Sequence, residues 1–517
     1  MKTVKEEARE IPVLAETDVV VVGGGPAGIG AALASGRTGA ETLLIDRFGS
    51  LGGLQTQGNN SIFTFVDPAL HGGVIQEILD RLAEGGALRD LDSVSESKKA
   101  RLRAPFTRGL SPDKLPKRLV ETSVGYWGQW GRTFDPEYYK YMLDAMMSEA
   151  GVGLLYHSFA AGAIREGDSL KGVVIETKEG RFAVLANVII DTTGEGDIAW
   201  KSGAPVMGDE GFPVGPRKGH PGGVLNAFFI AGVDLRKFRE FRKANMDEWG
   251  GMYGGRKLIR EAKTKGAYIK SDAVILSSDF DLYGTGRVYV MNAIHIVPED
   301  QKPWMPQEMT SCEIDLRKQA WAVQQLLKEK VPGFENSFIE KTPSLQCVGN
   351  GHRMIGDHVM TVGDMREGKA FEDAVAINNM PPDIYEAVGR FGYEILPHDI
   401  PYRSIVSKGI DNLLAAGTTM SSGSFAGAGL RYCTPSICTG QAAGTAAALA
   451  AKSNRSPKLV DIESLQNTLR DWGARVTVKD VTEEDLEPYR FIQKLGLMAE
   501  RTRGEARKVT EEEISRY

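Results

Sequence analysis

The sequence is poor in cysteine, in long apolar runs and in residues that secretion or membrane insertion would need. Its 517 residues include 4 cysteines, at positions 312, 347, 433 and 438, too few and too scattered for a disulfide framework. No CxxC pair is present to hold structural zinc, so we expect no metal. No run of about 18 apolar residues is present, and the charged start MKTVKEEARE lacks the apolar core of a secretion signal. These absences predict a cytoplasmic protein without membrane contact.

An excess of positive charge is also absent, whereas glycine is abundant. The 62 basic and 68 acidic residues give a net charge of −6, which excludes a global field for binding nucleic acid. The 60 glycines are about 12% of the 517 residues, against a usual share of roughly 7%. This excess indicates tight turns and close backbone approaches. The length exceeds the limit of about 250–300 residues for one core, so at least two structural units are expected.

The strongest local pattern lies between residues 17 and 46. The β-branched run at residues 19–22 is typical of a strand buried on both faces, and it is followed by glycines and an alanine-rich helical stretch. Residues 42–45 form a second short apolar strand. The pattern predicts a βαβ unit.

The glycines in this unit have the spacing G-x-G-x-x-G at Gly23, Gly25 and Gly28. This spacing serves a tight turn, the approach of a pyrophosphate and the packing of helix on strand. Asp46 ends the second strand, 18 positions after Gly28, where an acid can bind a ribose hydroxyl. Together these features predict a dinucleotide site.

Two later segments also lead from a strand into glycine. The first is a predicted β-meander that ends in D-T-T-G-E-G-D at residues 191–197, with strands at 153–156, 172–177, 181–185 and 188–190. The second is the strand at 412–417, followed by a Ser/Gly-rich loop and a helix to Lys452. Thr434 and Pro435 are typical of the N-cap and first residue of that helix.

These motifs resemble the FAD-dependent oxidoreductase family of the glutathione-reductase-like flavoprotein fold, related to the fumarate reductase and succinate dehydrogenase flavoproteins. The resemblance is carried by D-V-V-V-V-G-G-G-P-A-G-I-G-A-A, L-G-G at 51–53, F-D-P-E-Y-Y-K-Y-M-L at 134–143, V-I-I-D-T-T-G-E-G-D, I-P-Y-R-S-I-V at 400–406 and G-Q-A-A-G-T-A-A-A-L-A. It implies an α/β fold in which a Rossmann-like FAD-binding domain with a β-meander is interrupted by a mixed α+β substrate or cap domain. The expected FAD domain comprises 1–65, 136–204 and 396–455, the cap 66–135 and 205–395, and a helical tail 456–517.

The resemblance also implies which residues bind FAD. They are Gly23, Gly25, Pro26, Ala27, Gly28, Asp46, Arg47, Gly52, Gly53, Ala160, Gly194, Asp197, Gly417, Gly440, Gln441 and Gly444. In the family pattern the first glycines meet the pyrophosphate, the acid meets the ribose, the residue at 160 meets the adenine, and the last group lies against the flavin.

Three departures from related patterns narrow the expected chemistry. Residues 54–60, L-Q-T-Q-G-N-N, lack the redox Cys-x4-Cys of the glutathione-reductase type. No histidine lies between Asp46 and Asp67 to attach FAD covalently, so noncovalent FAD is expected. No second dinucleotide fingerprint appears, since G-G-M-Y-G-G at 250–255 lacks its flanking strand and helix. Electrons are therefore expected to pass between FAD and a bound substrate or a protein partner.

Catalysis is predicted to involve histidine and arginine in loops, because hydride transfer needs a proton carrier and groups that orient the substrate. We hypothesise that His398 moves the proton and Arg403 orients the substrate, with His352 and Arg353 as the next pair. A structural hydrogen bond is an equal interpretation for His398. Arg353, Arg403 and Arg431 are also candidates to clamp a carboxylate.

The aromatic group at 126–130, Y-W-G-Q-W, is either a substrate wall or part of the core. The resulting prediction is an FAD-dependent dehydrogenase or reductase that transfers hydride between noncovalent FAD and a small organic substrate, such as a carboxylate or hydroxy compound. The alternative is an electron-transfer flavoprotein subunit, resembling that of heterodisulfide reductases, that passes electrons to an iron–sulfur partner. The substrate, the direction, the electron donor or acceptor and the oligomeric state, a homo-oligomer included, stay open.

Overall fold

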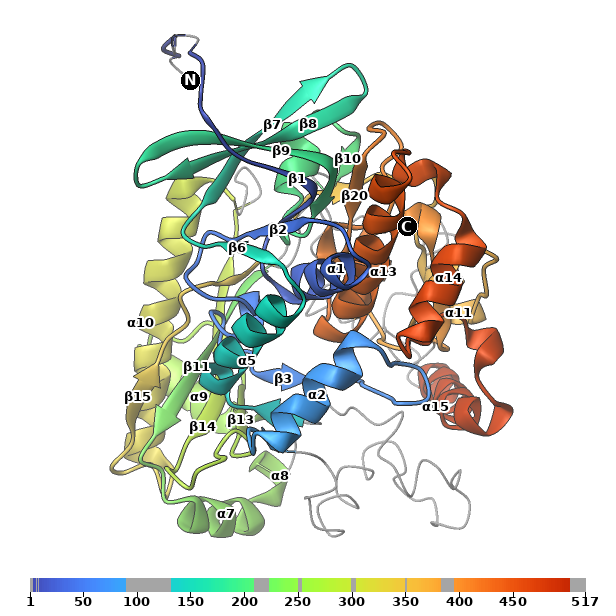
Figure 1. Ribbon diagram of the computed structural model, residues 1–517. Coiled ribbons are helices and arrows are strands. Elements are labelled where there is room, and N and C mark those ends of the chain that lie inside the picture. The colour runs from blue at the N-terminus through green and yellow to red at the C-terminus, as the bar shows by residue number, and fades with distance from the viewer. Residues whose placement is uncertain are drawn as a thin grey trace.

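A computed structural model describes residues 3–5, 7, 9–89, 132–208, 223–249, 253–298, 304–348, 351–382 and 395–502. Two sheets organise this part of the chain (Figure 1). The first has the strand order β6-β2-β1-β9-β8-β7, with β20 also paired to β9. Its strands are β1 (Val13–Val22), β2 (Thr42–Ile45), β6 (Gly153–Leu155), β7 (Phe159–Glu166), β8 (Ser169–Thr177), β9 (Gly180–Asp191) and β20 (Leu413–Ala415).

The first sheet combines a parallel layer with an antiparallel meander, as the sequence predicts for a Rossmann-type fold. Strand β1 pairs in parallel with β2 on one side and β9 on the other. Strand β2 also pairs in parallel with β6, and β9 also pairs in parallel with β20. Strands β7, β8 and β9 are antiparallel. The prediction was wrong in two details: residues 181–185 and 188–190 belong to one strand, and β7 was missed. The segment F-A-A-G-A-I-R-E of β7 is rich in alanine and glycine, which have low strand propensity.

Two helices lie side by side on the first sheet, in the centre of Figure 1: α1 (Pro26–Arg37) and α13 (Cys433–Lys452). Their backbones approach closely because small residues face one another. A Cβ on Gly440 would lie 2.0 Å from the Ala27 carbonyl oxygen, and one on Gly444 would lie 2.0 Å from that of Ala31. Any larger residue would separate the helices.

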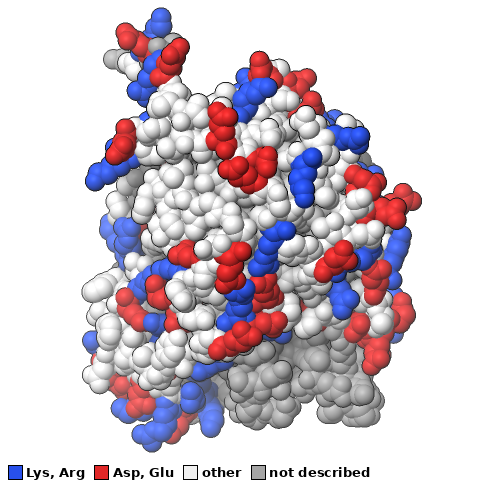
Figure 2. Space-filling model, in the orientation of Figure 1, with Lys and Arg blue, Asp and Glu red and all other residues white. Residues whose placement is uncertain are grey.

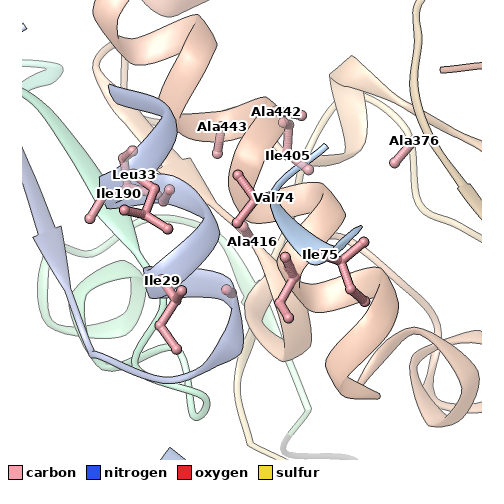
Figure 3. Packing of buried hydrophobic residues seen from close by; sticks show 14 of the residues in the cluster. Ile29, Leu33, Val74, Ile75, Ile190, Ala376, Ile405, Ala416, Ala442 and Ala443 are labelled. Carbon is pink, nitrogen blue, oxygen red and sulfur yellow. The ribbon is translucent and has the colours of Figure 1, made fainter. Parts of the chain in front are cut away.

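The main hydrophobic core surrounds this helix pair. Figure 3 shows Leu33 of α1 and Ala443 of α13 in this core, with Val74 and Ile75 of α2 packed beside them. Helix α2 spans Val74–Glu84, and α5 (Pro136–Glu149) contributes further core side chains. Segment 74–84, which the resemblance assigns to the cap, thus packs on the helices of the first sheet.

The second sheet is antiparallel and has the order β12-β13-β14-β11-β15, with β16 also paired to β11. The long helix α10 covers one face, on the left of Figure 1. The elements of this unit are β11 (Gly223–Ala231), α7 (Leu235–Ala244), α8 (Met246–Trp249), β12 (Tyr253–Gly254), α9 (Arg256–Thr264), β13 (Val274–Ser277), β14 (Val288–Ile296), α10 (Pro306–Lys330), β15 (Phe338–Lys341) and β16 (Cys347–Val348).

The other elements of the described residues are small strands, further helices and short turns. The small strands are β3 (Ile62–Phe63), β4 (Leu88–Arg89), β5 (Arg132–Phe134), β10 (Val206–Met207), β17 (Arg353–Met354), β18 (Ala374–Asn378) and β19 (His398–Pro401). The remaining helices are α6 (Asp197–Lys201), α11 (Val362–Glu367), α12 (Ser424–Leu430), α14 (Ile462–Asp471) and α15 (Glu483–Thr502), with 3-10 turns at Gly53–Gln55, Tyr402–Ser404, Gly417–Thr419, Pro457–Leu459 and Val478–Asp480.

The segment predicted as a tail contributes to the core. Leu465 and Leu469 of α14 are buried with the α1–α13 core, and the Tyr489 hydroxyl of α15 donates to Asp67 at 2.8 Å.

Acidic and basic residues are interspersed on the face of the molecule that Figure 2 shows. No described helix is long and apolar enough to cross a membrane.

Candidate active site

A long cavity lies where the carboxyl ends of the parallel strands meet the second sheet. The space between its lining residues measures about 1990 Å³, a volume that includes open solvent. One wall comes from the glycine turn after β1, the end of β2 and the turn after β9, and the other comes from the second sheet. In open α/β sheets, ligands bind at the carboxyl ends of the strands.

The glycine turn has no room for side chains on its protein side and open space on its cavity side. Gly23 has φ of 105°, and its Cβ would lie 2.5 Å from the Thr192 carbonyl oxygen. A Cβ on Gly28 would lie 1.8 Å from the Gly23 carbonyl oxygen. A Cβ on Gly25 would meet no described protein atom within 4 Å, and Gly25 lines the cavity. Because α1 begins at Pro26 with no side chain capping it, its N-terminal N–H groups are available to an anion.

Asp46 lies beside this turn at the end of β2. Its Oδ2 accepts a hydrogen bond from the Gly24 N–H at 2.5 Å, and its Oδ1 accepts one from Phe48 N–H at 2.7 Å. Burial raises the pKa of the Asp46 carboxyl, while the two N–H donors oppose the shift. An ionised carboxylate can accept further hydrogen bonds, so Asp46 can hold the turn and a ribose hydroxyl together.

Asp46→Ala is expected to weaken FAD binding by about 1.5–3 kcal/mol, the range for hydrogen bonds to a charged acceptor. The measurement is the dissociation constant of FAD from the apoprotein. Asp18→Ala is the matched control, because Asp18 accepts a backbone N–H between the same two strands, at 3.0 Å from Glu41, but does not line the cavity. Equal affinities in the two variants would remove Asp46 from the ribose role.

The turn after β9 is held by Asp191, whose carboxylate is fully buried. Its Oδ2 accepts the N–H groups of Ile198 and Ala199, and its Oδ1 accepts the N–H and hydroxyl of Thr193. The turn thereby presents Gly194, Glu195 and Asp197 to the cavity. Burial raises the pKa of Glu195, and the charge of Arg47 opposes that shift. Sequence reasoning did not single out Glu195.

The second sheet supplies an apolar wall. The lining side chains are Leu225, Ala227, Ile275, Tyr289 and Met291. The Tyr289 hydroxyl donates to Asn60 Oδ1 at 3.3 Å, and burial strongly raises its pKa. Tyr289 is therefore a protonated donor throughout the neutral pH range.

Polar groups on the same cavity lack partners within the described part of the protein. Thr64 Oγ1 and Gln346 Oε1 are buried without a hydrogen bond, and both residues line the cavity. Buried polar atoms are nearly always paired, so these two positions favour a bound ligand. Arg431, which follows the last residue of α12, and Cys433, the first residue of α13, also line the cavity, and burial raises the pKa of the Cys433 thiol.

The structure brings ten of the sixteen expected FAD residues to this cavity. These are Gly23, Gly25, Pro26, Ala27, Asp46, Arg47, Gly53, Ala160, Gly194 and Asp197. The other six are Gly28, Gly52, Gly417, Gly440, Gln441 and Gly444, which are absent from the lining.

Those six residues have packing contacts instead. Gly28 packs on the glycine turn, Gly440 and Gly444 pack on α1, and Gly417 faces the Ala27 side chain. Gly52 packs on Thr56, and Gln441 Oε1 accepts the Val74 N–H at 3.0 Å. Direct contact of these six with FAD stays a prediction.

His398 lies in strand β19 rather than in the predicted loop, and it does not line the cavity. Its side chain is fully buried; Nδ1 is 2.8 Å from the Leu396 carbonyl oxygen and Nε2 is 3.2 Å from Asn378 Nδ2. Burial lowers the pKa of His398 to about 4. These contacts support the structural interpretation, and a proton-carrying role stays a prediction.

Arg403 also lies outside the cavity lining. Its guanidinium is half exposed and pairs with Asp373 at 3.2 Å. This position directs the charge to the protein surface.

His352 and Arg353 are buried behind the turn after β9 and outside the cavity lining. The His352 ring stacks on Trp200, with centroids 5.2 Å apart. Arg353 Nε donates to the Ser422 carbonyl oxygen at 2.7 Å, and its Nη2 donates to Ser424 Oγ at 3.1 Å. Of the three arginines proposed as clamps, the structure brings Arg431 to the cavity.

The aromatic group at residues 126–130 lies outside the described residues, so its role as a substrate wall stays a prediction.

The predicted N-cap of α13 was wrong. Helix α13 begins at Cys433 after Tyr432, and Thr434 Oγ1 donates to the Thr64 carbonyl oxygen at 2.8 Å. The helix start nevertheless faces the cavity through Tyr432 and Cys433.

The βαβ unit, its glycine turn and the acid after β2 define a dinucleotide-binding α/β protein. Residues 18–469 match the family model of FAD dependent oxidoreductases, and the chain belongs to that family. It is an oxidoreductase that uses FAD. The finer resemblance to the glutathione-reductase-like and fumarate reductase groups stays a prediction.

Solved structures match the chain at low identity. A geranylgeranyl bacteriochlorophyll reductase-like protein from Thermoplasma acidophilum is 13% identical over 97% of this chain and 95% of its own, with a TM-score of 0.42. A p-nitrophenol 4-monooxygenase from Pseudomonas putida is 12% identical over 94% of this chain and 97% of its own, with a TM-score of 0.42. An L-proline dehydrogenase from P. horikoshii is 13% identical over 90% of this chain and 99% of its own, with a TM-score of 0.35. These likenesses carry no argument about the substrate. No curated protein matches the chain.

FAD fits the residues that line the cavity. The glycine turn leaves the space above Gly25 open for a pyrophosphate, and Asp46 offers a carboxylate for the ribose. Ala160 lines the same cavity, and the unpaired Thr64 and Gln346 oxygens offer further polar contacts to a ligand.

Proposed function

We propose that this protein transfers hydride between noncovalently bound FAD and a small, partly apolar organic substrate that carries a carboxylate or a carbonyl group. The observation that carries the proposal is the shared cavity: residues of the dinucleotide turn and an apolar wall from the second sheet line the same space. When bound, FAD supplies the hydride acceptor or donor. No histidine is among the described lining residues, which supports noncovalent binding.

The lining residues divide into three roles. Leu225, Ala227 and Met291 exclude water from the reacting part of the cavity, which strengthens the polar contacts inside it. Arg431 orients an anionic or carbonyl group of the substrate, because a guanidinium offers two parallel donors. Tyr289 keeps its proton, because burial raises its pKa, and its hydroxyl serves as a hydrogen-bond donor at the cavity wall.

The direct test is an anaerobic screen of small carboxylates, hydroxy acids and amines for bleaching of the flavin absorption of the purified protein. Bleaching by a metabolite at a rate near turnover supports hydride transfer from a substrate. Reduction by NADH or NADPH at that rate contradicts the expectation that no second nucleotide site is present. Iron that copurifies, with no response to any metabolite, favours the electron-transfer alternative.

Arg431→Lys is expected to raise KM for the substrate found in that screen by roughly 10- to 150-fold, while kcat changes less. Lysine keeps the charge but loses the fork, and the loss corresponds to about 1.5–3 kcal/mol. Steady-state kinetics measures the effect. Arg403→Lys is the matched control, because Arg403 pairs with Asp373 away from the cavity. A larger effect at Arg403 than at Arg431 would restore the original assignment of Arg403.

A further inference from the structure

A buried group of polar side chains lies between β14 and α10, on the face of the second sheet opposite the cavity. The pairing register of β14 shifts at one point: Met291 faces Ala227 on β11, but Ala293 faces Asn226. The extra residue forms a β-bulge, and a bulge can re-aim the side chains that follow it. Met291 lines the cavity, whereas Ala293 packs with Leu316 of α10. The bulge therefore turns His295 towards α10.

Helix α10 presents three polar side chains to His295. Glu308, Cys312 and Asp315 lie on one face because their spacing is four and three residues. His295 Nε2 is 2.7 Å from Glu308 Oε1, and His295 Nδ1 is 2.7 Å from Asp315 Oδ2. Cys312 Sγ is 4.0 Å from the same Glu308 oxygen. All four residues are buried.

We infer that His295, Glu308 and Cys312 bind one transition-metal ion of the zinc class. One ligand atom from each residue lies within 4.8 Å of the other two. Around a tetrahedral zinc ion with bonds of about 2.0–2.3 Å, ligand atoms are roughly 3–4 Å apart, so small side-chain rotations complete the site. Imidazole, carboxylate and thiolate are the three protein ligands that zinc takes. The sequence predicted no metal because it offers no CxxC spacing, and these ligands come from a strand and a helix.

The surroundings of His295 match those of a metal ligand. A metal-bound histidine usually gives its second ring N–H to a carboxylate, and Asp315 is that carboxylate here. Asp315 is itself fixed: Tyr268 donates at 2.5 Å, Lys270 at 2.6 Å and Gln319 at 3.0 Å. This arrangement holds the ring with Nε2 directed at Glu308 and Cys312.

The charges also balance around a divalent ion. With metal, the ion and Lys270 supply three positive charges, which offset the two carboxylates and the Cys312 thiolate. A hydrogen-bonded triad of Glu308, His295 and Asp315 explains the two carboxylates without a metal. That triad assigns no role to the buried Cys312 thiol. Net neutrality matters because an unpaired charge in a buried site is costly.

The test uses the full chain with its FAD. After incubation with zinc and dialysis, the protein is expected to retain about one zinc ion per chain. X-ray absorption at the zinc edge is expected to show one sulfur at about 2.3 Å and nitrogen or oxygen at about 2.0 Å. Flavin does not interfere with this measurement.

Two variants locate the ion. Cys312→Ser is expected to remove the sulfur shell, whereas Cys438→Ser, which changes a cysteine of α13 outside the group, is expected to keep it. Asp315→Asn is expected to weaken zinc binding by 10- to 100-fold in a chelator competition.

Retention of less than a tenth of an ion per chain by the wild-type protein would overturn the inference and leave the hydrogen-bonded triad. A zinc site without a sulfur neighbour in the wild-type protein would overturn it equally. Both decisive measurements use the wild-type chain, so they do not depend on whether any variant folds.

Discussion

Gly28→Ala is expected to abolish FAD retention, and Gly25→Ala to weaken FAD binding without disturbing the apoprotein. The added methyl of Gly28→Ala would lie 1.8 Å from the Gly23 carbonyl oxygen, so the glycine turn and α1 must move apart. Overpacking of this kind costs about 1–3 kcal/mol or more, and here it also displaces the N–H groups that face the pyrophosphate. We expect FAD affinity to fall by at least ~10², with a lower melting temperature of the apoprotein.

Gly25→Ala separates binding from folding. Its methyl meets no described protein atom within 4 Å, so the apoprotein should melt as the wild type does. The methyl nevertheless occupies the space into which the pyrophosphate fits, and an overpacking cost of about 1–3 kcal/mol corresponds to a roughly 5- to 150-fold loss of affinity. Calorimetric titration of FAD into the apoprotein measures both variants.

Gly162→Ala is the control for this pair, since Gly162 lies in β7 outside the cavity lining and its Cβ would make ordinary contact with Val174 at 3.7 Å. An unchanged FAD dissociation constant in Gly25→Ala would show that the pyrophosphate does not bind at this turn.

His398 is expected to make the folded protein sensitive to acid. An unperturbed histidine has a pKa near 6.5, and burial lowers the pKa of His398 to about 4. The unfolded chain therefore takes up the proton at a higher pH than the folded chain. The contribution of the neutral, buried His398 to the free energy of unfolding is fully present above pH 6.5. This contribution is lost as the pH falls from about 6.5 to about 4. The loss amounts to about 3 kcal/mol for this side chain.

His71 is expected to contribute in the same direction, because burial also lowers its pKa to about 4, against the opposing charge of Asp67. Urea denaturation midpoints between pH 7.5 and pH 4.5 measure the loss. His398→Asn should flatten this pH dependence, whereas His157→Asn, at an exposed histidine, should leave it as in the wild type.

The same variant distinguishes the two roles of His398. Normal turnover with a flattened acid dependence supports a structural histidine. A loss of turnover by 10²–10⁴, with the acid dependence unchanged, would instead identify the proton carrier.

Local patterns predicted the nucleotide half of the molecule well, because the signals there are short in sequence. A buried strand, a glycine turn and a helix follow one another within residues 19–37, and the turn geometry follows from glycine itself. The strands predicted at 42–45, 153–156 and 172–177 were confirmed as β2, β6 and β8 for the same reason. Strand β7 was missed because its alanines and glycine carry little strand preference, and its pairing with β8 decides its structure.

The catalytic half could not be predicted in this way. His398 and Arg403 lie beside and within the motif at 400–406 that helps to carry the family resemblance, yet one side chain is buried in β19 and the other faces the surface. The sequence offered Arg431 as one of three equivalent arginines, and only the turn between α12 and α13 places it on the cavity. Tyr289 and Gln346 carry no sequence signal, because they line the cavity only through the pairing and placement of the second sheet.

The sequence alone determined that this protein binds a dinucleotide, because that function depends on backbone conformations that glycine permits and on an acid at a set distance along the chain. Only the tertiary structure decided which side chains share the cavity with it. It also decided that His295 meets Glu308 and Cys312, since a bulge in β14 turns one strand's side chain towards a helix that follows it in the chain. Contacts between distant segments depend on packing and register, and no local spacing encodes them.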